Sequence, residues 1–156
     1  MKFSLLLVLI VLSGGSCREQ QQVIFPTPVD VCPLGNTVTT PAKGYQVISG
    51  SWQWVQSVSE NRLSGTRIST PSSTRKTRRF VFNIDRTYQY FVDQKLQESG
   101  TYELRNASND PILILQLQQA GQSTLGGVFI TLCDTGLILE GNAGDGGENE
   151  SYTHLP

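Results

Sequence analysis

The segment FVFNIDRTYQYFV, residues 80–92, decides the fold class because large apolar side chains alternate with other side chains on both sides of a turn. Such alternation places every second residue on the same face of an extended strand. The dipeptide Asp85-Arg86 between the two runs predicts a tight turn, so the segment is expected to form an antiparallel hairpin. The residues expected to share the inner face are Phe80, Phe82 and Ile84 before the turn, and Tyr88, Tyr90 and Val92 after it.

From residue 50 onward, similar short runs lie between turn signals, and no window of helical length carries an apolar stripe. In the first run, Trp52, Trp54 and Val58 are predicted to share a face, and Gly100 in a later run predicts a bulge or a bend. Eight short antiparallel strands with tight connections fit a closed barrel, because closure removes exposed edges. The expected fold is therefore all-β, an eight-stranded antiparallel up-and-down barrel. Besides the hairpin, the expected strands cover residues 52–58, 96–104, 112–117, 128–133, 137–140 and 151–155.

The N-terminus has the three parts of an export signal. Lys2 supplies a positive start, residues 3–12 an apolar stretch, and residues 13–16 a run of small side chains before Cys17. The apolar stretch is short for a transmembrane helix, which needs roughly 20 residues. Residues 1–16 are therefore predicted to be a lipoprotein signal peptide, with a lipid attached to Cys17. Ordinary secretion, which would leave Cys17 as a free thiol, is the alternative.

The cysteine count supports lipidation, because three cysteines in an exported protein leave one unpaired. If Cys17 carries a lipid, Cys32 and Cys133 are free to form a disulfide. This bond would close a loop of about 100 residues and stabilise the fold by about 4 to 5 kcal/mol. Two buried free thiols are the alternative.

Residues 17–49 hold a run of Gln and several Pro, with no sustained period of a strand or a helix. We interpret them as the lipidated cysteine followed by a tether, with the segment around Cys32 attached to the barrel. The expected division is thus a signal peptide (1–16), the lipidated tether (17–49) and the barrel domain (50–156). The formal net charge of −1 argues against a nucleic-acid partner.

Several motifs of the barrel segment resemble the small lipocalin-like lipoproteins of bacteria. Gly50-Ser51-Trp52 at the head of the first strand resembles the GxW signature that opens lipocalin domains. The motifs that follow in the same order are TPSSTRKT (70–77), FVF (80–82), DRTY (85–88), SGTY (99–102), LIL (137–139), GDG (144–146) and Tyr152.

The resemblance implies an eight-stranded barrel with room for an interior cavity, tethered to an envelope membrane, with Trp52 as a structural plug at one end. It implies no specific ligand, because the functions of this family are mostly unassigned. The sequence departs from the family at Arg86, where the turn usually has Gly; a non-Gly residue with positive φ costs turn stability. Residues 142–144 (Asn-Ala-Gly) replace a segment that often carries Cys, which implies a pairing role for Cys133.

One face of each strand would line such a cavity, and its large side chains suit an apolar or amphipathic ligand. The alternative is a purely structural role, in which these side chains fill the interior of a small barrel. The candidate ligand-binding residues are Trp54, Phe80, Phe82, Tyr88, Tyr90, Tyr102 and Ile114.

Other features carry weaker hypotheses. The cluster Arg75, Lys76, Arg78 and Arg79 could meet anionic groups, although such runs are usually solvated edges. The acidic loop at 141–150 lacks the spacing of a calcium loop, and the single histidine has no partner for catalysis or metal binding. We therefore expect no enzyme activity, metal or cofactor.

The expected function is that of an envelope lipoprotein, anchored in the outer membrane, whose barrel binds a small hydrophobic or amphipathic molecule. The alternative is a surface-interaction or envelope-structural protein with a solid barrel core.

Overall fold

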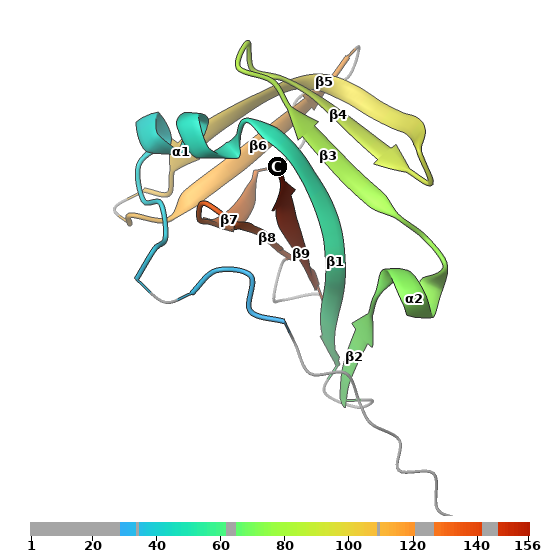
Figure 1. Ribbon diagram of the computed structural model, residues 1–156. Coiled ribbons are helices and arrows are strands. Elements are labelled where there is room, and N and C mark those ends of the chain that lie inside the picture. The colour runs from blue at the N-terminus through green and yellow to red at the C-terminus, as the bar shows by residue number, and fades with distance from the viewer. Residues whose placement is uncertain (1–28, 34, 62–64, 109, 121–126, 142–146) are drawn as a thin grey trace, which may run out of the picture.

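The computed structural model describes residues 29–33, 35–61, 65–108, 110–120, 127–141 and 147–156, and within these ranges the chain is mainly β-strand (Figure 1). The expected signal peptide and Cys17 lie outside the described residues. The elements in chain order are α1 (Pro41–Ile48), β1 (Gly50–Asn61), β2 (Gly65–Ser69), α2 (Pro71–Thr74), β3 (Arg78–Phe82), β4 (Thr87–Val92), β5 (Lys95–Asn106), β6 (Leu113–Gln119), β7 (Val128–Leu132), β8 (Gly136–Glu140) and β9 (Glu148–Leu155).

Eight of the strands form a closed antiparallel barrel, which confirms the predicted fold class. Strands β3 to β9 follow one another in sequence order, and β9 pairs with β1 to close the barrel. The long strand β1 has two neighbours on its other side: β3 pairs with residues Gly50–Gln53, and β2 pairs with Ser57–Asn61. The sequence did not predict β2, whose residues GTRIS lack alternating apolar side chains.

The predicted hairpin is confirmed, with one correction. Phe80 pairs with Tyr90 and Phe82 with Tyr88, so four aromatic rings point into the barrel. Ile84 was predicted to continue this inner face, but it lies in the turn and is 90% exposed. The turn begins one residue earlier than Asp85-Arg86, so the strand ends before Ile84 can reach the interior.

A β-bulge in β1 changes which side chains face inward. Trp54 pairs with Tyr152 of β9, but the next partner, Ser151, pairs with Gln56, so Val55 is an extra residue. Beyond the bulge Ser57 is fully buried and its hydroxyl accepts a hydrogen bond from Nε1 of Trp54 at 3.1 Å. The prediction that Val58 shares a face with the tryptophans is therefore wrong.

Gly100 is regularly paired, with Tyr88 on one side and Gln119 on the other, so the predicted bulge is not at this residue. The register shift lies two to three residues earlier, where Tyr90 pairs with Glu98 and Phe91 with Leu96. A Cβ atom on Gly100 would overlap the carbonyl oxygen of Gln118. Close approach of neighbouring strands explains this glycine.

Residues 29–33 and 35–49, which we expected to belong to a tether, are part of the folded domain. Helix α1 packs against β5 and β7 and covers one end of the barrel (Figure 1). Ile48 is fully buried, and its carbonyl oxygen accepts a hydrogen bond from Nε1 of Trp52 at 2.6 Å. Only Gly44 and Ile48 of the helix are buried, which is too few for a helical period to show in the sequence. None of the described helices is long and apolar enough to cross a membrane.

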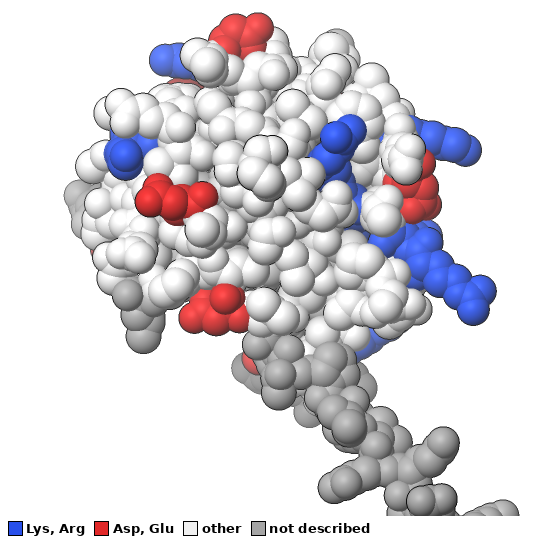
Figure 2. All heavy atoms as spheres, viewed as in Figure 1, with Lys and Arg blue, Asp and Glu red and all other residues white. Residues whose placement is uncertain are grey.

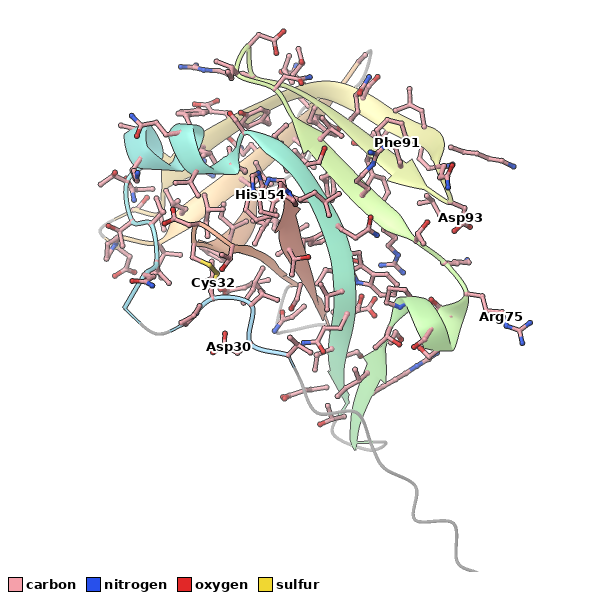
Figure 3. The ribbon with its side chains drawn as sticks, viewed as in Figure 1. Asp30, Cys32, Arg75, Phe91, Asp93 and His154 are labelled. Atoms are coloured by element: carbon pink, nitrogen blue, oxygen red, sulfur yellow. A yellow bond between two sulfur atoms is a disulfide. The ribbon has the colours of Figure 1, made fainter. Side chains whose placement is uncertain are left out.

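Cys32 and Cys133 form the predicted disulfide, with their Cα atoms 5.7 Å apart. The bond ties the chain before α1 to the end of β7, and its yellow sulfur atoms are visible beside the Cys32 label (Figure 3). The main-chain amide of Val38 also donates a hydrogen bond to the carbonyl of Leu132 at 2.8 Å. The N-terminal segment is therefore fixed to the barrel by a covalent bond and by hydrogen bonds.

Candidate functional site

The predicted ligand-binding aromatic residues pack against one another inside the barrel. The ring of Phe80 lies 5.4 Å from Phe82, 4.6 Å from Tyr90 and 5.5 Å from Tyr152 between centroids. Phe82 in turn meets Tyr102 edge-on at 5.0 Å. Of the seven predicted residues, six belong to the core or pack against it: Trp54, Phe80, Phe82, Tyr88, Tyr102 and, half-buried, Tyr90. In the described part of the chain, the middle of the barrel is thus filled by its own side chains.

Ile114 does not share this interior. It pairs with Arg105 on β5 and with Phe129 on β7, and it lies outside the core cluster that contains its neighbours Leu113 and Leu115. Its prediction as a lining residue is therefore wrong. The run ILIL is apolar on both faces, so its sequence did not reveal which face points inward.

Trp52 lies at the barrel end that α1 covers, where it is fully buried. Its ring packs 4.7 Å from the ring of His154, which is labelled beside β1 in Figure 3. The Nε2 atom of His154 is buried and has no hydrogen-bond partner among the described residues. A Cβ atom on Gly50, whose φ is +133°, would overlap this Nε2 atom, so the glycine leaves room for the imidazole.

Charged side chains occur inside the barrel near its other end, and we call Arg78, Glu98 and Glu150 the inner polar cluster. Arg78 forms an ion pair with Glu150, and its guanidinium carbon lies 4.5 Å from the centre of the Trp54 ring. The phenol of Tyr152 donates to Glu150 at 2.6 Å, and that of Tyr88 donates to Glu98. The Arg78 and Glu150 side chains are 23% and 22% exposed, so solvent reaches them.

Sequence reasoning placed Arg78 in a surface cluster and Glu150 in a loop, and it did not connect them. The strand period could have done so, because Arg78 stands two residues before the inward Phe80, and Glu150 two residues before the inward Tyr152.

The phenols around the cluster remain protonated at neutral pH. Burial, followed by the nearby charge of Glu150, raises the pKa of Tyr152, and burial with the hydrogen bond to Glu98 raises the pKa of Tyr88. Burial also raises the pKa of Tyr90. These phenols therefore act as hydrogen-bond donors to carboxylates and not as bases.

Two grooves open on the outside of the barrel, and each contains an arginine over an aromatic ring. The first groove has a volume of about 470 Å³, and in it the guanidinium carbon of Arg79 lies 4.7 Å from the centre of the Phe91 ring. The second groove has a volume of about 550 Å³ and contains Arg86, whose guanidinium carbon lies 4.6 Å from the centre of the Tyr45 ring. The first is lined by Gln53, Thr77, Arg79, Phe91, Gln94 and Leu155. The second is lined by Asp85, Arg86, Thr101, Tyr102, Glu103, Gln116 and Gln118.

Figure 2 shows basic side chains concentrated on the side of the molecule that β3 and α2 occupy, whereas acidic side chains are spread over the visible face. Arg75, at the C-terminal end of α2, extends into solvent there (Figure 3). Among the described residues, no three His, Cys, Asp or Glu side chains gather where they could hold a metal ion. Comparisons with protein-family models, with curated proteins and with solved structures found no match.

Proposed function

We propose that this protein is an exported, lipid-anchored envelope protein whose barrel is a solid scaffold for binding on its outer surface. The observation that carries the proposal is the packing of Phe80 against Phe82, Tyr90 and Tyr152, which leaves both grooves on the outside. The proposal includes no catalytic step. Membership of the lipocalin-like lipoproteins is part of it, and the closed antiparallel barrel supports that membership.

The disulfide supports export, because such bonds persist in oxidising compartments outside the cytosol. It also supports lipidation at Cys17. With Cys32 and Cys133 bonded to each other, Cys17 is the remaining cysteine of the three. An anchor gives that thiol a role that an unpaired thiol in an oxidising compartment lacks.

The anchor is tested by expressing the chain in a bacterium with a labelled fatty acid, beside the variant Cys17→Ala. We expect label and membrane fractionation for the parent chain and neither for the variant. The variant Cys32→Ala is the matched control, because it also removes one thiol but should keep the label. Equal labelling of the parent and Cys17→Ala would overturn the anchor.

A second candidate function is binding of a small amphipathic molecule at the inner polar cluster, which solvent reaches. An ion pair inside a barrel adds little stability over apolar side chains, so Arg78 and Glu150 suit a binding role as well as a structural one. Native mass spectrometry of the Cys17→Ser protein separates the two candidates. A bound small molecule that the double variant Arg78→Met, Glu150→Gln no longer retains would favour the inner site.

A further inference from the structure

We propose that the first groove, on the outer face of β1, β3 and β4, binds an amphipathic anion: a carboxylate or phosphate group attached to a short apolar chain. This inference rests on the proposed outer-surface binding and names its site and the class of its ligand. We call this groove the outer groove; it is the one lined by Gln53, Thr77, Arg79, Phe91, Gln94 and Leu155.

The strand register builds the outer groove from a row of outward-facing side chains. Gln53 of β1 pairs with Arg79 of β3, and Arg79 pairs with Phe91 of β4. Leu155, at the end of β9, lies opposite Ser51 on the other side of β1. An amide, a guanidinium and apolar groups therefore border one hollow of about 470 Å³, which falls within the size range of small-molecule sites.

Arg79 is a cation that has no anionic partner among the described residues. Its guanidinium rests over the Phe91 ring, whereas the one ion pair within the described residues joins Arg78 to Glu150. A guanidinium on an aromatic face keeps N–H donors at its edge, and these donors match the oxygens of a carboxylate or phosphate. The groove therefore offers a fixed donor group for an anion.

The charges around the outer groove favour an anion as well. Arg75 and Lys76 lie just before Thr77 and are exposed, and Asp93 is the neighbouring acidic side chain. One oxygen of Asp93 already accepts the main-chain N–H of Thr77 at 2.8 Å and its hydroxyl at 3.4 Å. Arg79 is therefore the cation that lines the groove, and the carboxylate of Asp93 is engaged in the turn.

The groove also has apolar surface beside Arg79, so we expect the anion to carry an apolar chain. Leu155 is 37% exposed and the Phe91 ring is half-buried, so both can still lose water on binding. The second groove also places an arginine beside an aromatic ring, but its charge differs. Its single arginine, Arg86, shares the hollow with the carboxylates of Asp85 and Glu103.

The test titrates the Cys17→Ser protein with decyl phosphate below its micelle concentration and follows backbone amide shifts by NMR. Inorganic phosphate and a neutral decyl glycoside are run as separate probes. We expect decyl phosphate to shift amides of the outer groove, and to bind at least about tenfold more tightly than either probe, because both the charge and the chain contribute. Equal affinity for the neutral glycoside would overturn the proposal.

Two variants isolate the role of the groove from that of overall charge. Arg79→Gln should weaken decyl phosphate at least about tenfold, the loss expected for a charge-assisted hydrogen bond. Arg75→Gln removes the same charge from the neighbouring surface and should weaken binding by less than about twofold, because an exposed charge outside the groove is screened. Equal losses in the two variants would mean diffuse attraction and would overturn the site.

The shift map also separates this inference from the function on which it rests. Shifts at the second groove would overturn the outer groove and keep outer-surface binding, whereas shifts at the inner polar cluster would overturn both. No shift at any amide would overturn the ligand class. Binding of the protein to vesicles with and without anionic lipid identifies the source of the anion. Binding to anionic vesicles that depends on Arg79 indicates lipid head groups of a bilayer, whereas binding to decyl phosphate but not to vesicles indicates a free amphiphile.

Discussion

Arg78 and Glu150 form an ion pair inside the barrel, reaching across strand β1 from its two neighbours β3 and β9. The Trp54 ring lies under the guanidinium, and the Tyr152 phenol donates to the carboxylate. Each charge therefore depends on the other, since most of the surface of both side chains is withdrawn from water.

Removing only one member of this pair should cost more than neutralising both. Arg78→Met leaves a carboxylate without its cation, whereas Arg78→Met with Glu150→Gln keeps an acceptor for Tyr152 and removes both charges. We expect the single variant to be less stable than the double by about 1 kcal/mol, a modest value because the pair is partly solvated. Urea unfolding measures the difference, and equal stability would show that the pair is uncoupled.

The disulfide should contribute a large share of the stability. Cys32 and Cys133 are 101 residues apart, so the double variant Cys32→Ser, Cys133→Ser should lose about 4 to 5 kcal/mol on the chain-entropy estimate. The control is Cys17→Ser, which removes a cysteine outside this bond and should leave the urea midpoint unchanged. A loss below about 1 kcal/mol in the double variant would mean that contacts of α1 hold the segment without the bond.

Phe82 and Ile84 are two residues apart but should respond very differently to truncation. Phe82 is 1% exposed inside the barrel, so Phe82→Ala should cost about 3 to 5 kcal/mol through lost burial and the cavity left behind. Ile84 is 90% exposed, so Ile84→Ala should change stability by less than about 0.5 kcal/mol. Similar losses in thermal or urea unfolding would contradict the position of the turn.

The turn between β4 and β5 should be stabilised by one glycine. Asp93 and Gln94 have φ angles of 49° and 65°, the left-handed conformation that two-residue hairpin turns require and that Gly adopts without strain. Gln94→Gly should therefore raise the free energy of unfolding by about 1 kcal/mol. Gln89→Gly, within β4, is the matched control and should lower it by roughly 0.5 to 1 kcal/mol.

Stability should fall as the pH rises above about 10, the pKa of tyrosine in an unfolded chain. Burial raises the pKa of Tyr88, Tyr90, Tyr102 and Tyr152 in the folded protein, so the unfolded state loses these protons first and is favoured by alkaline conditions. Urea midpoints measured across this range should decline. Absorbance near 295 nm should show that these phenols ionise only with unfolding; early ionisation of all tyrosines in the native protein would contradict the burial.

The sequence predicted the barrel because its hairpins repeat the two-residue period, as the pairing of Phe82 with Tyr88 confirms. The sequence-based prediction was wrong where the two-residue period of apolar side chains is interrupted or absent. The bulge at Val55 reverses which side chains of β1 face inward, and no residue type in the sequence marks its position. The run around Ile114 is apolar on both faces, so it shows no alternation. Helix α1 buries only Gly44 and Ile48, so its attachment depends on contacts distant in sequence.

The candidate site was predictable only in part. The interior aromatic residues followed from alternation, but their mutual packing, which moves the candidate binding surface outward, is a property of the closed barrel. The outer groove brings together side chains from β1, β3, β4 and β9. Arg79 and Phe91 lie on separate strands, and their stacking depends on a register that the sequence does not specify.

The attachment of the segment around Cys32 to the barrel limits how far the folded domain can lie from a lipid on Cys17. In the proposed anchored form, twelve residue steps separate the lipid on Cys17 from Val29, whose carbonyl accepts a hydrogen bond from the Gln56 side chain. Covalent geometry limits that stretch to about 40 Å. If the disulfide is reduced and the side-chain hydrogen bonds to Val29 and Val31 also break, the next hydrogen bond between the main chains of the described segment and the barrel is at Val38, which would allow roughly 70 Å. In the anchored form, the oxidised protein would therefore stay within a thin layer next to the membrane. Reduction of the disulfide would help the folded domain to move farther from the bilayer.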